Sequence, residues 1–189
     1  MGHRADRPLP IDRIDGLPVV EAVEAWCGLA TFLVLDDLIA AGDRLIGLPI
    51  PIATLGEIDR AIQERSGMRG VVRLREARAE MRPNAYSSRE TWARLVLVRA
   101  GLPEPEANGR ILLRSGRWTK GDLVFRPWMV LLEYEGEQHL TDPAQWATDL
   151  TRYNDLTEAG WLVIRVSKRM RPHELIARTR RALRFRGLA

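Results

Sequence analysis

Acidic residues follow one apolar run in the second half of the chain. The stretch WMVLLEYEGEQH, residues 128–139, ends with Glu133, Glu135 and His139. Alternate side chains of a strand share a face, so Glu133 and Glu135 are expected to point the same way. Burying ionised carboxylates is costly unless they are paired or bind a cation. The pattern therefore indicates either a cation site or acids that are solvated or paired with arginines.

Another acid precedes this run at hairpin spacing. Asp122 lies in KGDLVF, and the turn signal of Arg126 and Pro127 separates the two apolar segments. A two- or four-residue loop would place Asp122 opposite Leu131 and diagonal to Glu133, on the same face. A three-residue loop would put the two acids on opposite faces.

Two converging carboxylates repel each other, and a shared proton or a divalent cation resolves the repulsion. Mg²⁺ prefers one or two carboxylates, with waters and phosphate oxygens, and leaves positions open for chemistry. Such a site fits phosphodiester hydrolysis, with His139 moving protons. The phosphate-loop motif G-x-x-x-x-G-K-[ST] does not occur, so we expect no nucleotide cofactor.

Composition is that of an ordinary globular protein. The 189 residues are 46% hydrophobic and 29% charged, which excludes disorder throughout. No uninterrupted apolar stretch of about 18 residues occurs, and the N-terminus lacks the apolar segment of a signal peptide. We therefore expect a cytoplasmic protein with no membrane partner. The single cysteine, Cys27, excludes an internal disulfide and a cysteine-cluster zinc site.

Basic charge is concentrated at the C-terminal end. Residues 165–189 hold nine Arg or Lys and one acid, Glu174, a local net charge of +8 in a chain of net charge +4. Arginine supplies most of it, and the planar guanidinium suits phosphate oxygens. The stripe is equally compatible with nucleic-acid contact and with a solvated helix face.

Hydrophobic periodicity divides the chain into a helical first part and a mixed second part. The helical segments of residues 1–83 are VVEAVEAWCGLA, FLVLDDLIAAGDRLIG, TLGEIDRAIQER and GVVRLREARAEM. Residues 84–189 predict a helix in SSRETWARLVLVRAG, strands in GRILLRSGRW, KGDLVF and WMVLLEYEG, a helix in PAQWATDLTRYNDLTEAG, a strand in WLVIRV and a helix in PHELIARTRRALRF. Helix, three-stranded meander, helix, strand and helix together predict an α/β fold.

The motifs of the second part resemble a known family. They are S-x-x-E in SSRETWARL, D-L-V-F eleven residues before E-Y-E-G-x-x-H, and QWATDLTRYNDLTEAGWLVIRV. Residues 84–185 look like the endonuclease-like domain related to very-short-patch-repair enzymes, in the PD-(D/E)XK superfamily, especially a group common in actinobacteria. The resemblance implies a restriction-endonuclease-like core in residues 84–189, a helical region in residues 1–83, and hydrolysis of DNA with Mg²⁺ or Mn²⁺.

The resemblance also implies roles for individual residues. Asp122 matches the metal-binding aspartate of the PD motif, with Gly121 in place of the usual proline. Glu133 matches the second metal-binding acid, and the main-chain carbonyl of Tyr134 would be a further ligand. Glu90, on the helix before the sheet, matches an acid that superfamily members use for a second metal or a bridging water.

The remaining matches lie further along the chain. His139 matches the family histidine, a candidate general acid or base, and Asp149 and Arg152 match a helical acid and arginine. Arg152 either contacts phosphate or pairs with Asp149 at i, i+3 spacing. Lys168 and Arg169, in the basic C-terminal end, are further candidates for nucleic-acid contact.

This sequence departs from the family pattern at several positions. Glu135, a catalytic candidate, stands where the superfamily usually has lysine and the related group tends to have aspartate, and Gln138 replaces a frequent second histidine. Members of the group often carry an antitoxin-like winged helix upstream, so we expect a shortened form with weaker DNA targeting. The alternative function is an inactive nuclease fold that binds nucleic acid or regulates a toxin partner.

Overall fold

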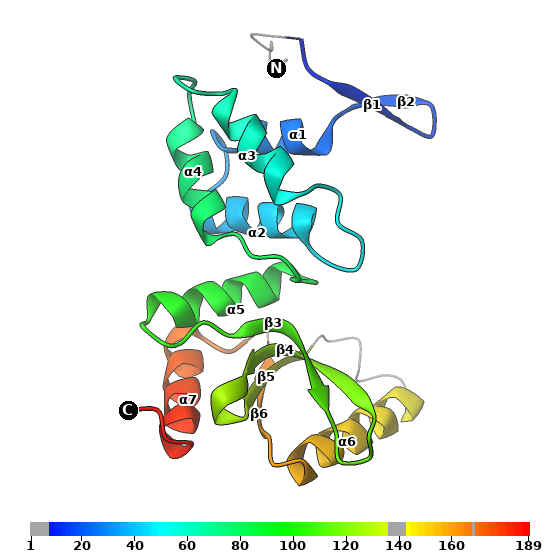
Figure 1. Cartoon of the computed structure of the whole chain (residues 1–189), viewed down its shortest axis with the longest axis vertical. Coiled ribbons are helices and arrows are strands. Elements are labelled where there is room, and N and C mark those ends of the chain that lie inside the picture. The colour runs from blue at the N-terminus through cyan, green and yellow to red at the C-terminus, as the bar shows by residue number, and fades with distance from the viewer. Residues whose placement is uncertain (1–7, 136–142, 168) are drawn as a thin grey trace. The chain divides into compact units, whose positions relative to one another are not determined.

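The chain forms two compact units, Met1–Ser88 and Arg89–Ala189. The computed structural model describes residues 8–135, 143–167 and 169–189, without the side chains of residues 135 and 143–147. Helices dominate the first unit, and the second is built on a four-stranded sheet (Figure 1). The fold is therefore mixed α/β, as the sequence predicts. The sequence-based boundary, after residue 83, lies a few residues before the division.

All four described helices of the first unit contribute buried apolar side chains. Its elements are β1 (Ile11–Ile14), β2 (Leu17–Val20), α1 (Ala22–Leu29), α2 (Leu35–Ile46), α3 (Leu55–Gln63) and α4 (Val71–Glu80). Trp26 of α1 is buried, as are Leu38 of α2, Ile58 of α3 and Leu74 of α4. Its Nε1–H donates to the carbonyl of Leu38 at 2.9 Å, so the ring ties α1 to α2.

The hairpin of β1 and β2 is a feature that the sequence analysis missed. Asp15 and Gly16 have φ angles of 51° and 80°, which is typical of a two-residue type I′ turn. The register pairs Ile14 with Leu17. The predicted helix start at residue 19 is therefore wrong, and α1 begins at Ala22. The dipeptide Asp-Gly carried the turn signal.

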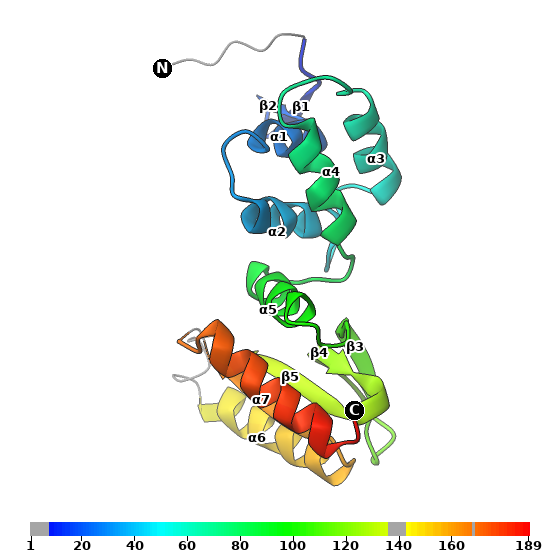
Figure 2. The same ribbon diagram turned by 90° about the vertical axis from the view of Figure 1, so that its left-hand side faces the viewer.

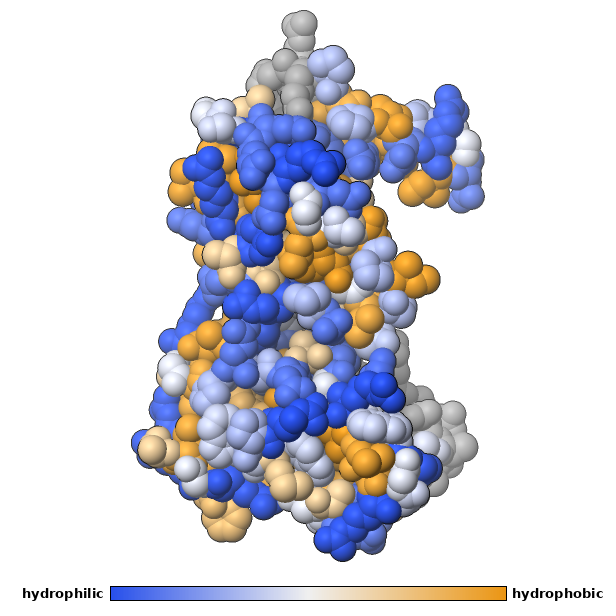
Figure 3. Space-filling model, viewed as in Figure 1, coloured by the Kyte–Doolittle hydropathy of each residue, from blue (hydrophilic) through white to orange (hydrophobic). Residues whose placement is uncertain are grey.

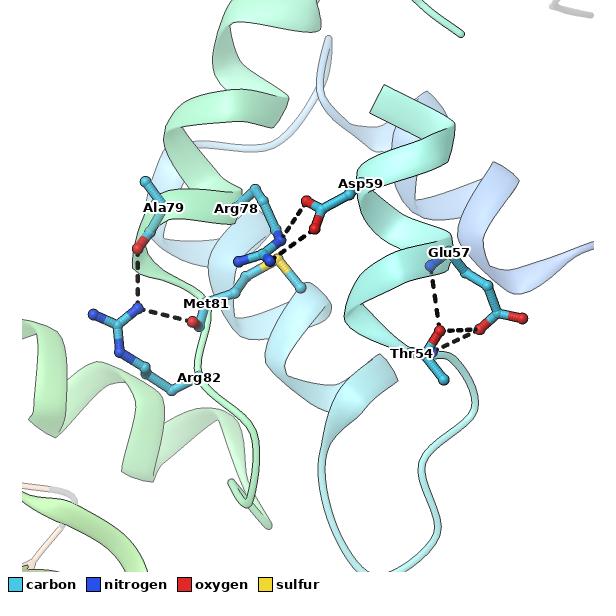
Figure 4. Close-up of polar contacts among 7 residues, drawn as sticks. All are labelled: Thr54, Glu57, Asp59, Arg78, Ala79, Met81 and Arg82. Carbon is cyan, nitrogen blue, oxygen red and sulfur yellow. Dashed lines mark hydrogen bonds and ion pairs between the residues drawn. The ribbon is translucent and has the colours of Figure 1, made fainter. Parts of the chain in front are cut away.

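Polar contacts fix the ends of α3 and α4 (Figure 4). Thr54 and Glu57 form the predicted capping box: the Glu57 N–H donates to Thr54 Oγ1 at 3.2 Å, and the Thr54 N–H donates to Glu57 Oε2 at 2.7 Å. Arg78 of α4 donates to both oxygens of Asp59 of α3, at 2.7 and 2.9 Å. The bidentate pair aligns the two helices.

The second unit contains the predicted three-stranded meander. Its elements are α5 (Ser88–Arg99), β3 (Glu106–Leu112), β4 (Trp118–Phe125), the 3₁₀ turn η1 (Arg126–Trp128), β5 (Val130–Glu135), α6 (Pro143–Glu158), β6 (Leu162–Ser167) and α7 (Pro172–Phe185). The sheet order is β3-β4-β5-β6. The first three strands are antiparallel and β6 runs parallel to β5.

The register of β4 and β5 differs from the prediction. Leu131 lies opposite Val124, and not opposite Asp122. The cause is the position of the connection: η1 and Met129, at a φ of 50°, place the four-residue loop at residues 126–129, one residue later than the four-residue loop of the prediction. Since the shift is an even number of residues, it preserves the faces that were expected for the paired residues 123–125 and 130–132.

Helices cover both faces of the sheet: α7 and α6 lie on opposite sides of the strands in Figure 1, and in Figure 2 α7 faces the reader with α6 behind it. The core between the sheet and α5 and α7 includes Leu123, Phe125, Leu132, Ile164, Leu97, Leu175 and Leu183. The core on the α6 side includes Ile111, Val124, Leu131, Leu156 and Trp161. Because Leu131 belongs to the α6 side, alternation places Glu133 on that side as well.

Hydrophobic side chains also reach the surface. Ile50 and Ile52, in the connection between α2 and α3, are 74% and 57% exposed, and hydrophobic surface is visible over this connection in Figure 3.

No helix in the described parts of the chain is long and apolar enough to span a bilayer.

The capping box yields a stability prediction. Thr54→Ala removes an acceptor for the first-turn N–H groups of α3, so it should lower the free energy of unfolding by about 1 kcal/mol. Urea denaturation followed by circular dichroism measures the change. Gln63→Ala, an exposed substitution at the other end of the same helix, is the control. An equal effect of the two substitutions would argue against a capping role.

Candidate functional site

A carboxylate ends the hydrogen-bond ladder between β4 and β5. The last paired residues are Leu123 and Leu132. Beyond them, Asp122 Oδ2 accepts a hydrogen bond from the main-chain N–H of Tyr134 at 2.6 Å. The side chain of Asp122 thus occupies the place of a main-chain partner. This bond fixes the carboxylate of Asp122 beside β5, next to Glu133.

Arg152 of α6 holds Glu133 in a two-pronged ion pair. Its Nη1 and Nη2 donate to Glu133 Oε2 and Oε1, both at 2.8 Å. Its Nε donates to Thr119 Oγ1 at 2.8 Å, and Nη2 also donates to the main-chain carbonyl of Lys120. The guanidinium therefore connects α6 with both β4 and β5. The side chains of Arg152 and Glu133 are 31% and 18% exposed, so water screens the pair only in part.

Charge and burial shift the pKa values of the cluster. Burial raises the pKa of Asp122 from 3.8 to about 6, and the neighbouring Glu133 charge adds to the rise. The Tyr134 N–H and the charge of Arg152 oppose it. Burial lowers the pKa of Arg152, but hydrogen bonds and charge from Glu133 outweigh it and raise the pKa overall. Asp122 and Asp149 add to that rise, so three acids surround one guanidinium.

Two glycines leave room for the side chains of Val124 and Leu131 next to Asp122. Gly121 lies opposite Gly109 in the register of β3 and β4. A Cβ at Gly121 would overlap the side chain of Leu131, which is fully buried and has little room to move. The proline that the family motif usually carries at this position would therefore not fit without rearrangement.

Glu90 is hydrogen-bonded to β3, the strand next to β4 in the sheet. This side chain of α5 is 6% exposed and accepts a hydrogen bond from Asn108 Nδ2 at 2.6 Å. Asn108 has a φ of 51° and lies at a gap in the pairing of β3 with β4, between Ala107 and Gly109. Asp122 lies at the same gap on β4, between Gly121 and Leu123. Glu90 is thus linked through Asn108 to the strand that flanks Asp122.

The structure brings part of the predicted site together. Asp122 and Glu133 share one location, and Tyr134 contributes its N–H. No group of three or more His, Cys, Asp or Glu side chains among the described residues is arranged to hold a metal ion, so Glu90 does not join the two acids in such a group. The site in the described residues is a carboxylate pair bridged to an arginine.

Other predicted residues lie apart from the pair or outside the description. Arg169 is exposed in the turn after β6. Glu135 is the last residue of β5, opposite Ser167, and its side chain lies outside the described residues. His139 and Lys168 lie wholly outside them.

Sequence reasoning missed Thr119, Asn108 and the partner of Arg152. The spacing of Arg152 suggested Asp149, one turn away, whereas the bidentate partner is Glu133 on β5. That contact depends on how α6 packs on the sheet, which no local spacing encodes. The position of Asn108 had a usable signal, since Asn-Gly favours positive φ.

The raised pKa of Asp122 makes stability depend on pH. The folded protein holds the proton more tightly than the unfolded chain, so stability is lost as pH rises from about 4 to about 6. Asp122→Asn keeps an acceptor for Tyr134 but cannot ionise. Over this pH range the free energy of unfolding of the variant should rise by on the order of 2 kcal/mol relative to that of wild type. Urea titrations at several pH values test this, and Glu133→Gln should reduce the effect. A constant difference would contradict the assignment.

Removing the guanidinium should destabilise the second unit. Arg152→Met leaves Glu133 without its cation beside a second acid, which should cost about 1–3 kcal/mol at neutral pH. Arg117→Met is the matched control, because Arg117 pairs with Asp155 of the same helix but is 65% exposed. Its loss should cost less than about 1 kcal/mol. Equal losses in thermal unfolding would mean that the pair is ordinary surface electrostatics.

Comparison with known proteins gives relatives without an assigned activity. Two uncharacterized proteins of Mycobacterium tuberculosis, one from each of two strains, are 34% identical to the chain over 130 residues. The match covers 67% of this chain and 48% of each relative. The chain thus spans about half the length of the curated relatives it matches. No family model and no solved structure matches it.

Proposed function

We propose that the second unit is a restriction-endonuclease-like domain that hydrolyses DNA phosphodiester bonds with Mg²⁺ or Mn²⁺. The observation that carries the proposal is the gathering of Asp122 and Glu133 where the β4–β5 ladder ends. Two neighbouring carboxylates suit a hard divalent cation that also takes waters and phosphate oxygens. The element order α5-β3-β4-β5-α6-β6-α7 adds support, since it is the order that the family resemblance implies.

Each residue of the cluster has a role in this proposal. Asp122 and Glu133 would hold the cation, with the Tyr134 carbonyl as a further ligand. A cation at this position supplies Lewis acidity toward a phosphate oxygen and toward water. Arg152, once released from Glu133, presents a fork that suits a phosphate. Glu90 supports the neighbouring strand through Asn108, and moving a proton falls to His139, outside the described residues.

The ion pair of Glu133 and Arg152 favours a second candidate function. An acid neutralised by a bidentate arginine needs no cation. In this alternative the cluster stabilises an inactive nuclease fold. The unit would then bind nucleic acid through its arginine-rich C-terminal end, where Arg169 is exposed, or regulate a toxin partner.

A cleavage assay tests the first function. Wild type should nick or cut supercoiled plasmid in Mg²⁺ or Mn²⁺ and be inactive in EDTA. Asp122→Asn and Glu133→Gln should each reduce the rate about 100-fold or more, because each removes a negative ligand. Glu106→Gln, which changes an exposed acid of β3 paired with Arg126, should cut at the wild-type rate.

The same proteins separate the two functions. If wild type cuts no faster than Asp122→Asn with any metal, the hydrolytic function is lost. DNA binding that weakens steeply with rising salt would then support the binding module, because phosphate contacts release counterions. Neither cleavage nor salt-dependent binding would leave both functions without support.

A further inference from the structure

One edge of the sheet in the second unit is open to a further strand. β6 is the last strand in the order β3-β4-β5-β6, and it pairs with β5 alone among the described strands. The N–H of Leu162 donates to the carbonyl of Met129, on the side of β5. Alternation therefore directs the main-chain N–H and C=O groups of Val163 and Arg165 outward. An open edge of this kind is a template for strand pairing.

A groove runs along this edge between β6 and α7. Residues 162–165 form one wall, and Arg178, Arg181, Ala182 and Phe185 of α7 form the other, around a cavity of about 410 Å³. Phe185 is 78% exposed, so an aromatic ring borders the groove without being covered. The groove thus combines apolar side chains, a strand edge and arginines.

The charges of the groove select the occupant. Arg178 and Arg181 of α7 contribute positive charge to the lining, and no acid belongs to it. Glu174, the acid of α7, lies 3.6 Å from Arg178 in an exposed pair that contributes little. A second copy of this chain would bring like charges together, which disfavours a symmetric dimer. An acidic partner is complementary.

The apolar part of the lining distinguishes a peptide from a nucleic acid. Phosphodiesters gain from arginine but not from Leu162, Ile164 and Ala182, which line the groove. A peptide strand matches both, because successive side chains on its face toward α7 can be apolar and acidic in turn, and so meet Ala182, Phe185 and the arginines of that helix. Its main chain can pair with the outward groups of β6.

The geometry points to a docking site for an extended acidic and hydrophobic peptide segment of a partner protein, added to β6 as a parallel or antiparallel strand. Val163 and Arg165 supply main-chain hydrogen bonds, Phe185 and Ala182 take apolar side chains, and the arginines select acids. The site stands apart from the proposed hydrolysis, because neither Asp122 nor Glu133 lines the groove.

Nuclear magnetic resonance of the full chain, labelled with ¹⁵N, tests the site. The probe is a short synthetic peptide of repeated Val-Val-Glu-Glu, which places valine and glutamate in turn on each face of the strand. It should shift the amide resonances of residues 162–165 and of α7 around Ala182. A peptide of valine and lysine, and a valine–glutamate peptide N-methylated at alternate residues, should bind about tenfold more weakly or not at all, having lost the charge match or the strand pairing.

Charge reversal provides the matched control. Arg181→Glu should weaken the valine–glutamate peptide about tenfold and strengthen the valine–lysine peptide, whereas Arg184→Glu, on the same helix outside the groove, should change neither. Far-ultraviolet circular dichroism checks that both variants fold. Equal effects of the two reversals, the absence of shifts at residues 162–165 up to millimolar peptide, or preferential binding of single-stranded oligothymidine in the groove would each overturn the proposal.

Discussion

The ion pair of one guanidinium with Glu133, beside the second carboxylate of Asp122, is the interaction on which the candidate site depends. Glu133 lies close enough to Asp122 for its charge to raise the pKa of Asp122, and both acids interact with Arg152. Without a cation, partly buried acids at this distance would repel each other or take up a proton. Arg152 provides that cation from α6, and its contacts with Thr119 and the Lys120 carbonyl fix its orientation. The arrangement thus places a cation beside two neighbouring carboxylates.

The fold makes this arrangement possible by different means on the two faces of the sheet. On the side of α5 and α7, a continuous apolar core anchors β4, β5 and β6. On the side of α6, the core ends at Leu131, and Glu133 follows on the same face. Gly109 and Gly121 leave space there for the side chains of Val124 and Leu131. The core that positions α6 thus also brings Arg152 to the acids.

The sequence predicted the order of elements better than the contacts between them. Alternating apolar residues and the turn signal at Arg126 and Pro127 were sufficient for the meander, because a strand pattern and a short loop are local properties. The register was wrong by two residues, since the 3₁₀ turn and the left-handed Met129 place the four-residue loop one residue further along the chain. The two acids are nevertheless close together, because Asp122 accepts the hydrogen bond of the Tyr134 N–H next to Glu133. The partner of Arg152 could not be predicted, because helix packing on a sheet has no fixed spacing along the chain.

The two candidate functions differ in which positive charge finally occupies the acidic pair. Arg152 is covalently tethered and already oriented, so any competing cation must exceed its favourable interaction before the two acids become ligands. Displacement of Arg152 from Glu133 would also free its hydrogen-bond donors. A guanidinium displaced from Glu133 stays attached to α6, and its five N–H donors then need new acceptors. Phosphate oxygens are the acceptors that match its fork best. An ion pair that closes the site in the absence of substrate can therefore become a substrate contact, so the bridge between Glu133 and Arg152 is compatible with catalysis as well as with a purely structural role.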